Sequence, residues 1–171
     1  SIGDIMAGWY ALKMGLPVRR LVCASNKNDV LTEFLNTGHY DRKREFYKTT
    51  SPSMDILVSS NLERLLYYVC GPEHTVDYMK QLEQNGEYTI TDDELAEIKS
   101  VFTGIYAGDD EGAAAIKDVF EADKYLMDTH TSIAWACMEK YQDASDCSGV
   151  PAVVLSTASP YKFSAAVLEN R

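Results

Sequence analysis

Apolar and polar residues alternate along the chain in blocks that predict both helices and strands. An apolar run over residues 3–14, ended by a glycine and a proline, is typical of a helix with a glycine stop. The shorter apolar run at 20–24 predicts a buried strand, and a polar turn follows it. Asn28 or Asp29 then caps a helix that continues to Leu35. This order of elements is typical of a layered α/β domain.

The middle of the chain has apolar residues three and four positions apart, which is the spacing of amphipathic helices. Helices are expected, in order, at about 62–70, 73–85, 91–102, 112–120 and 130–141. The apolar segment Pro151–Leu155 predicts a further strand, and a closing helix is expected at 162–169. Ligands of open parallel sheets bind beyond the carboxyl ends of the strands, so the loops 25–28 and 156–159 are expected to border a ligand site.

Charge adds a second pattern, because the acidic excess lies in one segment. The 171 residues include 26 acidic and 16 basic side chains, a net charge of −10. Residues 83–128 hold 13 of the acids and only three lysines. A solvated helical face is the simplest interpretation. A metal site is the alternative, although the acidic triplets at 92–94 and 109–111 lack the ligand spacing of a calcium loop.

Several classes of function are disfavoured by composition. The pI of about 4.7 argues against a nucleic-acid-binding surface, and no apolar run approaches membrane-spanning length. No secretory leader is recognised. The four cysteines lack the short spacing of zinc or redox sites, so free thiols in a reducing cytoplasm are expected. No metal site is predicted, because the three histidines are scattered.

Local motifs leave a small set of candidate ligand-binding residues. No nucleophile elbow, dinucleotide loop or Walker loop is present. Gly3 and Asp4 begin the first helix, whose free N–H groups could bind an anion or could be a plain helix start. Thr131 fits a helix cap beside His130, and Thr157 fits a turn hydroxyl that satisfies backbone groups.

Four sequence blocks resemble threonine synthases, which are pyridoxal-phosphate enzymes of fold type II. The block at 51–64 is the one most similar to the family, with SPSMDILVSSN followed by Glu63 and Arg64. The other three blocks are GDIMAGWYALKMGLP at 3–17, SNKNDVL at 25–31 and LSTASPYKF at 155–163. The blocks stand in the family's order over nearly the whole chain. Ser159 differs from the histidine that the family has there.

The resemblance implies the C-terminal part of the large catalytic domain of such an enzyme. The expected architecture is α/β and three-layered, with a partly parallel sheet, flanking helices and the acidic segment 83–128 as a helical insertion. The family converts O-phospho-L-homoserine and water to L-threonine and phosphate with pyridoxal phosphate. None of the ten lysines stands in the family's Schiff-base motif, so this chain alone is expected to be inactive. Another fold type II lyase, or a non-catalytic ligand-binding module, is the alternative.

The resemblance also assigns roles to individual residues. Cofactor contacts are implied for Gly3, Asp4, Ser25, Asn26 and Thr157. Thr157 matches the hydroxyl that hydrogen-bonds the pyridine nitrogen, whereas Asp4 fits a capping role because a carboxylate repels a phosphate. His130 and Thr131 are expected to close the substrate side. Arg64 has two interpretations, as a structural ion-pair partner or as a contact of the substrate phosphate.

Overall fold

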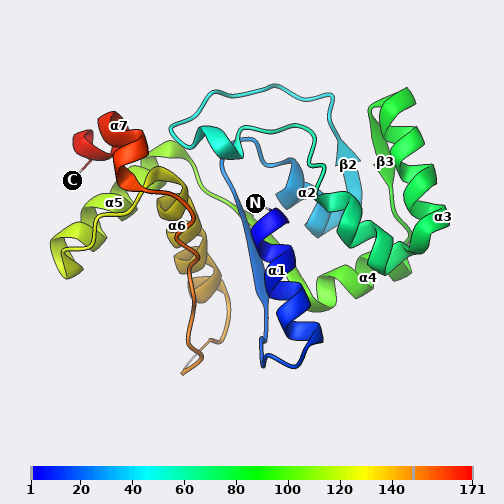
Figure 1. Ribbon diagram of the computed structural model, residues 1–171, viewed down its shortest axis with the longest axis horizontal. Coiled ribbons are helices and arrows are strands. Elements are labelled where there is room, and N and C mark those ends of the chain that lie inside the picture. The colour runs from blue at the N-terminus through cyan, green and yellow to red at the C-terminus, as the bar shows by residue number, and fades with distance from the viewer. Residues whose placement is uncertain (1, 148, 171) are drawn as a thin grey trace. The chain divides into compact units, whose positions relative to one another are not determined.

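The computed structural model describes residues 2–147 and 149–170 and confirms the α/β class (Figure 1). Its longer elements are α1 (Ile2–Lys13), β1 (Leu21–Ser25), α2 (Val30–Thr37), β2 (His39–Asp41), α3 (Leu62–Asn85), β3 (Glu87–Thr89), α4 (Asp92–Val101), β4 (Phe102–Tyr106), α5 (Asp109–Asp123), α6 (Thr129–Ala144) and α7 (Ser164–Glu169). Two 3₁₀ turns, η1 (Pro52–Met54) and η2 (Pro160–Phe163), complete the described elements.

The chain divides into two compact units, each built from several segments. The first unit contains Ser1–Cys23, Asp29–Phe46 and Ile56–Gly104. The second unit contains Ala24–Asn28, Tyr47–Asp55 and Ile105–Arg171. The strands β1 and β4 pair with each other in a parallel sheet.

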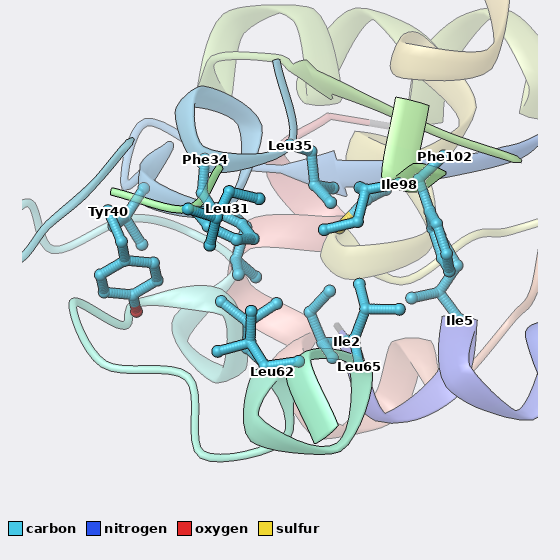
Figure 2. Close-up of a cluster of buried hydrophobic side chains, with 14 of the residues drawn as sticks. Ile2, Ile5, Leu31, Phe34, Leu35, Tyr40, Leu62, Leu65, Ile98 and Phe102 are labelled. Atoms are coloured by element: carbon cyan, nitrogen blue, oxygen red, sulfur yellow. The ribbon is translucent and has the colours of Figure 1, made fainter. Parts of the chain in front are cut away.

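The first unit has a core built from the apolar faces of its helices. Figure 2 shows Ile2 and Ile5 of α1 with side chains of α2, α3, α4 and β4 around one apolar cluster. Leu65, Phe34 and Leu35 are fully buried in it. The spacing of these residues along each helix places them on one face, so burial of this face holds the helices together.

A short antiparallel ribbon of β2 and β3 adds an aromatic stack to that core. Tyr40 faces Tyr88 across the ribbon, with ring centroids 5.3 Å apart and planes inclined by 5°. Tyr78 of α3 stacks on the other face of Tyr88 at 5.3 Å. Because side chains alternate along a strand, the burial of Tyr40 and Tyr88 turns the neighbouring positions outward.

The second unit contains α5 and α6 packed against each other. Ile116, Met127 and Ile133 are buried in its apolar cluster. Gly112 permits this close approach, because a Cβ there would lie 3.0 Å from Ile133 Cδ1 and 3.1 Å from Ser132 Oγ. A helix was predicted at 112–120, and α5 confirms it but begins three residues earlier.

The predicted strand at Pro151–Leu155 is wrong, since this segment is irregular and largely exposed. Val153 is 82% exposed and Leu155 is 54% exposed. A strand needs a hydrogen-bonded neighbour, and within the described residues no strand pairs with this segment. Conversely, β2 and β3 have three residues each and are too short for periodicity to reveal them, and the five-residue β4 was not predicted.

The acidic triplets of segment 83–128 occupy the first turns of two helices. Asp92–Glu94 begin α4 and Asp109–Glu111 begin α5. Carboxylates are stabilised at these positions by the positive end of the helix dipole, and Glu94 completes a capping box with Thr91. The segment also holds β3 and β4, so it is mixed in structure.

The kink in α3 agrees with the predicted interruption at Gly71 and Pro72. Gly71 has φ 79° and ψ 169°, a conformation that L side chains rarely adopt, and it separates two helical stretches. Among the described residues, no helix is both long and apolar enough to cross a bilayer.

Gly104 of β4 lies directly against the backbone of α2. A Cβ at this position would stand 2.6 Å from Thr32 Cα and 2.8 Å from the Thr32 carbonyl oxygen. The Asn36 side chain donates to the Gly104 carbonyl at 2.9 Å and accepts from its N–H at 3.3 Å. A side chain at residue 104 would therefore displace α2 from the strand.

We expect Gly104→Ala to lower the free energy of unfolding by about 1–3 kcal/mol, because the new methyl group has backbone on one side and cannot be accommodated by a rotamer change. Gly8→Ala is the matched control, since its Cβ would meet only the flexible end of Leu21. Urea unfolding should show the large loss at residue 104 alone. Equal effects of the two substitutions would contradict this account.

Candidate functional site

The loop that follows β1 is fixed by the buried side chain of Asn26. Asn26 Nδ2 lies 2.8 Å from Thr49 Oγ1, 3.0 Å from Ser51 Oγ and 2.7 Å from Asp55 Oδ1. Its Oδ1 accepts from the backbone N–H of Asn28 at 3.0 Å, which makes the tight turn after the strand. All of these groups belong to the second unit.

The Asp55 carboxylate is the acceptor that the donors of this network share. Its Oδ1 accepts from Asn28 Nδ2 at 3.0 Å and from the Thr49 hydroxyl at 2.7 Å, in addition to Asn26. Its Oδ2 accepts from the Thr49 backbone N–H at 3.0 Å. Asn28 in turn binds the backbone of Tyr47 through both its amide nitrogen and its oxygen. One charge therefore ties segment 24–28 to segment 47–55.

A second polar cluster begins α6 and fixes the protonation state of His130. The backbone N–H of Ser53 donates to His130 Nε2 at 3.1 Å, so this nitrogen carries no proton. Nδ1 therefore holds the proton and donates it to Asp128 Oδ1 at 3.0 Å. The ring is a neutral imidazole that connects the start of α6 to η1, and it packs on Phe163 with a centroid separation of 4.6 Å.

Asp128 is the N-cap of α6 and is almost completely buried. Burial raises the pKa of its carboxyl. Hydrogen bonds from the His130 ring, from the Thr131 hydroxyl and from both backbone N–H groups outweigh that effect, so the pKa lies below its usual value. The carboxylate stays ionised at neutral pH and holds both His130 and Thr131 in place.

The hydroxyl groups near Thr131 extend this cluster toward the C-terminal segment. Thr131 Oγ1 lies 3.4 Å from Ser156 Oγ, and the Tyr125 hydroxyl lies 3.3 Å from the same oxygen. Thr157 follows Ser156 directly and is exposed. The loop at 156–159 is thus held beside the start of α6, with the Thr157 side chain accessible to a ligand.

A hollow of about 430 Å³ opens in the second unit beyond the carboxyl ends of β1 and β4. Its lining residues are Lys27, Tyr47, Lys48, Thr49, Gly108, Asp109, Asp110 and Glu111. The Lys27 ammonium lies 3.9 Å from the centroid of the Tyr47 ring. The hollow therefore offers ammonium and carboxylate groups together. Lys27 brings the predicted loop 25–28 to it, whereas its lining residues include none from the predicted loop 156–159.

The structure brings five of the predicted site residues into the second unit and places the other three in the first. Ser25 and Asn26 are buried in the loop after β1, His130 and Thr131 begin α6, and Thr157 lies in the C-terminal segment. The remaining residues are Gly3 and Asp4 in the first turn of α1, and Arg64 in the first turn of α3. Within the second unit, Asn26 and His130 are both hydrogen-bonded to segment 51–55.

Sequence reasoning missed the residues that organise this environment. Asp55 and Ser53 lie in the block SPSMD, whose role no periodicity revealed, and their distant partners Asn28, Asn26 and His130 are 27, 29 and 77 residues away in sequence. The signal that could have found them is local. A serine- and aspartate-rich segment around a proline is typical of a turn whose side chains bind backbone groups.

We expect Asp55→Ala to lower the free energy of unfolding by about 3 kcal/mol, because two amide groups and a hydroxyl lose a charged acceptor. Asp110→Ala, which removes an exposed carboxylate near the start of α5, should cost less than about 1 kcal/mol. Thermal unfolding of both variants measures the difference. Comparable losses would show that Asp55 does not carry the network.

We expect the advantage of the wild type over Asp128→Asn to depend on pH. Asparagine keeps the helix cap but not the charge. A carboxyl whose pKa is lowered on folding contributes stability that is present above its unfolded pKa of about 3.9, and this is lost as the pH falls through the lower folded value. The difference in unfolding free energy should be constant above about pH 5 and shrink in stronger acid. A difference that grows on acidification would contradict the assignment.

Comparisons with known proteins identify threonine synthases as similar proteins. Residues 131–170 match the family described as "Threonine synthase, C-terminal". The threonine synthase of Schizosaccharomyces pombe is 36% identical, and threonine synthase-like 1 of Macaca fascicularis is 37% identical. These alignments cover 98% and 99% of this chain, but 37% and 23% of the relatives.

Solved structures give the same result in three dimensions. A threonine synthase from Brucella melitensis, determined with bound pyridoxal phosphate, has a TM-score of 0.90 at 41% identity. A yeast threonine synthase has a TM-score of 0.94 at 33% identity. Both alignments cover 99% of this chain and 36% of the other, so the chain spans about a third of the length of these relatives. Nearly the whole of this chain is therefore similar to about a third of the threonine synthases that it matches, and residues 131–170 match their C-terminal family model.

Proposed function

We propose that this chain is the C-terminal part of a threonine synthase, which converts O-phospho-L-homoserine and water to L-threonine and phosphate. The observation that carries the proposal is the match of 99% of the chain to a threonine synthase with bound pyridoxal phosphate, at a TM-score of 0.90. The site in the second unit supports it, because polar groups gather beyond the carboxyl ends of β1 and β4. The four free cysteines support a reducing compartment such as the cytoplasm.

The residues present fit the pyridine end of pyridoxal phosphate. Thr157 is exposed and follows Ser156, whose hydroxyl lies within hydrogen-bond reach of Tyr125 and Thr131. A threonine hydroxyl can donate to a neutral pyridine nitrogen, whereas a carboxylate there would favour a protonated ring. Pyridoxal phosphate, when bound, accepts the electron pair of a substrate carbanion.

We assign the other predicted residues supporting roles. Ser25 and Asn26 line the cofactor ring from the rigid turn after β1. His130 and Thr131 border the substrate. His130 brings no positive charge to it, because its Nε2 accepts from the Ser53 N–H and so carries no proton. The resemblance assigns Gly3 and Asp4 to the cofactor phosphate, and it makes Arg64 a candidate contact of the substrate phosphate.

No lysine of this chain is assigned the role of transferring protons. The resemblance gives none of the ten lysines the family's Schiff-base motif, so the remaining two thirds of the relatives' length would supply that group. The chain is then an essential part of the catalytic domain rather than a complete catalyst. Its inactivity when expressed alone follows from the same assignment.

A graft tests the proposed function. The region of the Brucella melitensis enzyme that this chain matches is replaced by the chain, and phosphate release from O-phospho-L-homoserine is measured. We expect the graft to release phosphate, and the 171-residue chain with added pyridoxal phosphate to release none. Phosphate release by the chain alone would contradict the missing lysine. A folded graft that binds pyridoxal phosphate but releases no phosphate would favour a non-catalytic module.

Within the graft, we expect Thr157→Ala to lower kcat by about 100-fold, because the ring nitrogen loses a positioned donor. Thr157→Ser keeps the hydroxyl and should restore most of the rate. Both variants should unfold within about 2 °C of the parent, since residue 157 is exposed. Equal rates for the alanine and serine variants would remove Thr157 from the cofactor site.

A further inference from the structure

The outer face of the β2–β3 ribbon holds three metal-ligating side chains that the proposed function does not use. His39 and Asp41 are two residues apart on β2, and Glu87 is the register partner of Asp41 on β3. Because Tyr40 and Tyr88 point into the core, these three side chains share the opposite face of the ribbon. One ligand atom from each lies within 4.8 Å of the others.

The orientation of His39 is the second observation. Its Nδ1 lies 2.9 Å from the Thr89 hydroxyl, across the ribbon from it. This contact leaves Nε2 facing Glu87, whose Oε2 is 3.9 Å away. In metal-binding histidines, a hydrogen bond at one ring nitrogen fixes the orientation of the ring while the other nitrogen binds the metal. The Thr89 hydroxyl gives His39 such a contact at Nδ1.

We propose that His39, Asp41 and Glu87 form a Zn²⁺ site on this face, separate from the polar site of the second unit. One imidazole and two carboxylates suit zinc better than calcium or magnesium, which prefer oxygen ligands alone. Tetrahedral zinc with ligand bonds of about 2.0–2.1 Å needs ligand atoms roughly 3.4 Å apart. Small rotations of these partly exposed side chains close the present separation, and water completes the coordination.

Lys43 acts as the competitor of the metal at this site. Its Nζ lies 2.9 Å from Glu87 Oε1, and its backbone N–H donates to Asp41 Oδ1 at 2.7 Å. The ammonium occupies one carboxylate in the absence of metal and must leave it when zinc binds. Removal of the lysine charge should therefore strengthen zinc binding, an effect that a purely structural ion pair would not produce.

The test titrates the intact chain with Zn²⁺ and follows the ¹⁵N signals of the histidine rings together with the binding heat. We expect one zinc ion to shift the Nε2 signal of His39. His39→Ala should raise the Kd at least tenfold, Thr89→Val should raise it severalfold by releasing the ring, and Lys43→Gln should lower it severalfold. Lys80→Gln, at an exposed lysine of α3, is the matched charge control and should leave the Kd unchanged.

His74→Ala is the control for histidines, because His74 lies 2.6 Å from Glu94 on another part of the first unit. Zinc binding should survive this substitution. An unshifted His39 signal, a loss of binding in His74→Ala, or a Kd that Lys43→Gln fails to lower would each overturn the proposal. None of these measurements depends on phosphate release, so failure here is separate from failure of the proposed function.

Discussion

The Asp55 carboxylate is the interaction on which the candidate site depends. A loop beyond a strand end has no ladder to satisfy its backbone, so its polar groups need other partners. Asp55 accepts from Asn26, Asn28 and Thr49, and the two asparagines then satisfy the neighbouring backbone. A charged acceptor shared among several donors makes the loop rigid before any ligand arrives. Rigid polar loops at the carboxyl edge of parallel strands are suited to holding a cofactor.

At the start of α6, the carboxylate of Asp128 likewise accepts hydrogen bonds from several donors, one of which is a neutral histidine ring. Asp128 is buried and ionised, and it remains so because hydrogen bonds at the helix N-terminus replace its hydration. His130 is neutral because its two ring nitrogens have opposite roles, one accepting from Ser53 and one donating to Asp128. This cluster therefore adds a single negative charge that is already compensated. It positions Thr131 and the neighbouring hydroxyls without adding charge to the ligand side.

The acidic excess, the most conspicuous feature of the composition, has a local explanation. Much of it is concentrated in the first turns of α4 and α5, where carboxylates favour helix formation. The proposed metal ligands lie outside these two helix starts: His39 and Asp41 belong to β2, and Glu87, which is part of segment 83–128, belongs to β3. Charge density along the sequence does not by itself indicate a metal site, because coordination depends on a few side chains converging from separate segments.

The sequence by itself determined most helices, the first strand and the resemblance to threonine synthases. The spacing of apolar residues predicted α1, α2, α4 and α6 to within a few residues. The gap at residues 71–72 between two predicted helices corresponds to the kink at Gly71 in α3. These features are local, since they depend on periodicity and on backbone conformations that particular residues prefer.

Only the tertiary structure decided the features that need distant partners. The ribbon of β2 and β3, the irregular path of Pro151–Leu155 and the roles of Asp55 and Ser53 all depend on which segments meet in space. A strand exists only with a neighbour, and a buried polar group is satisfied only by whichever donor or acceptor the fold brings to it. A short stretch of sequence does not contain both partners of such a contact, so it cannot predict the contact.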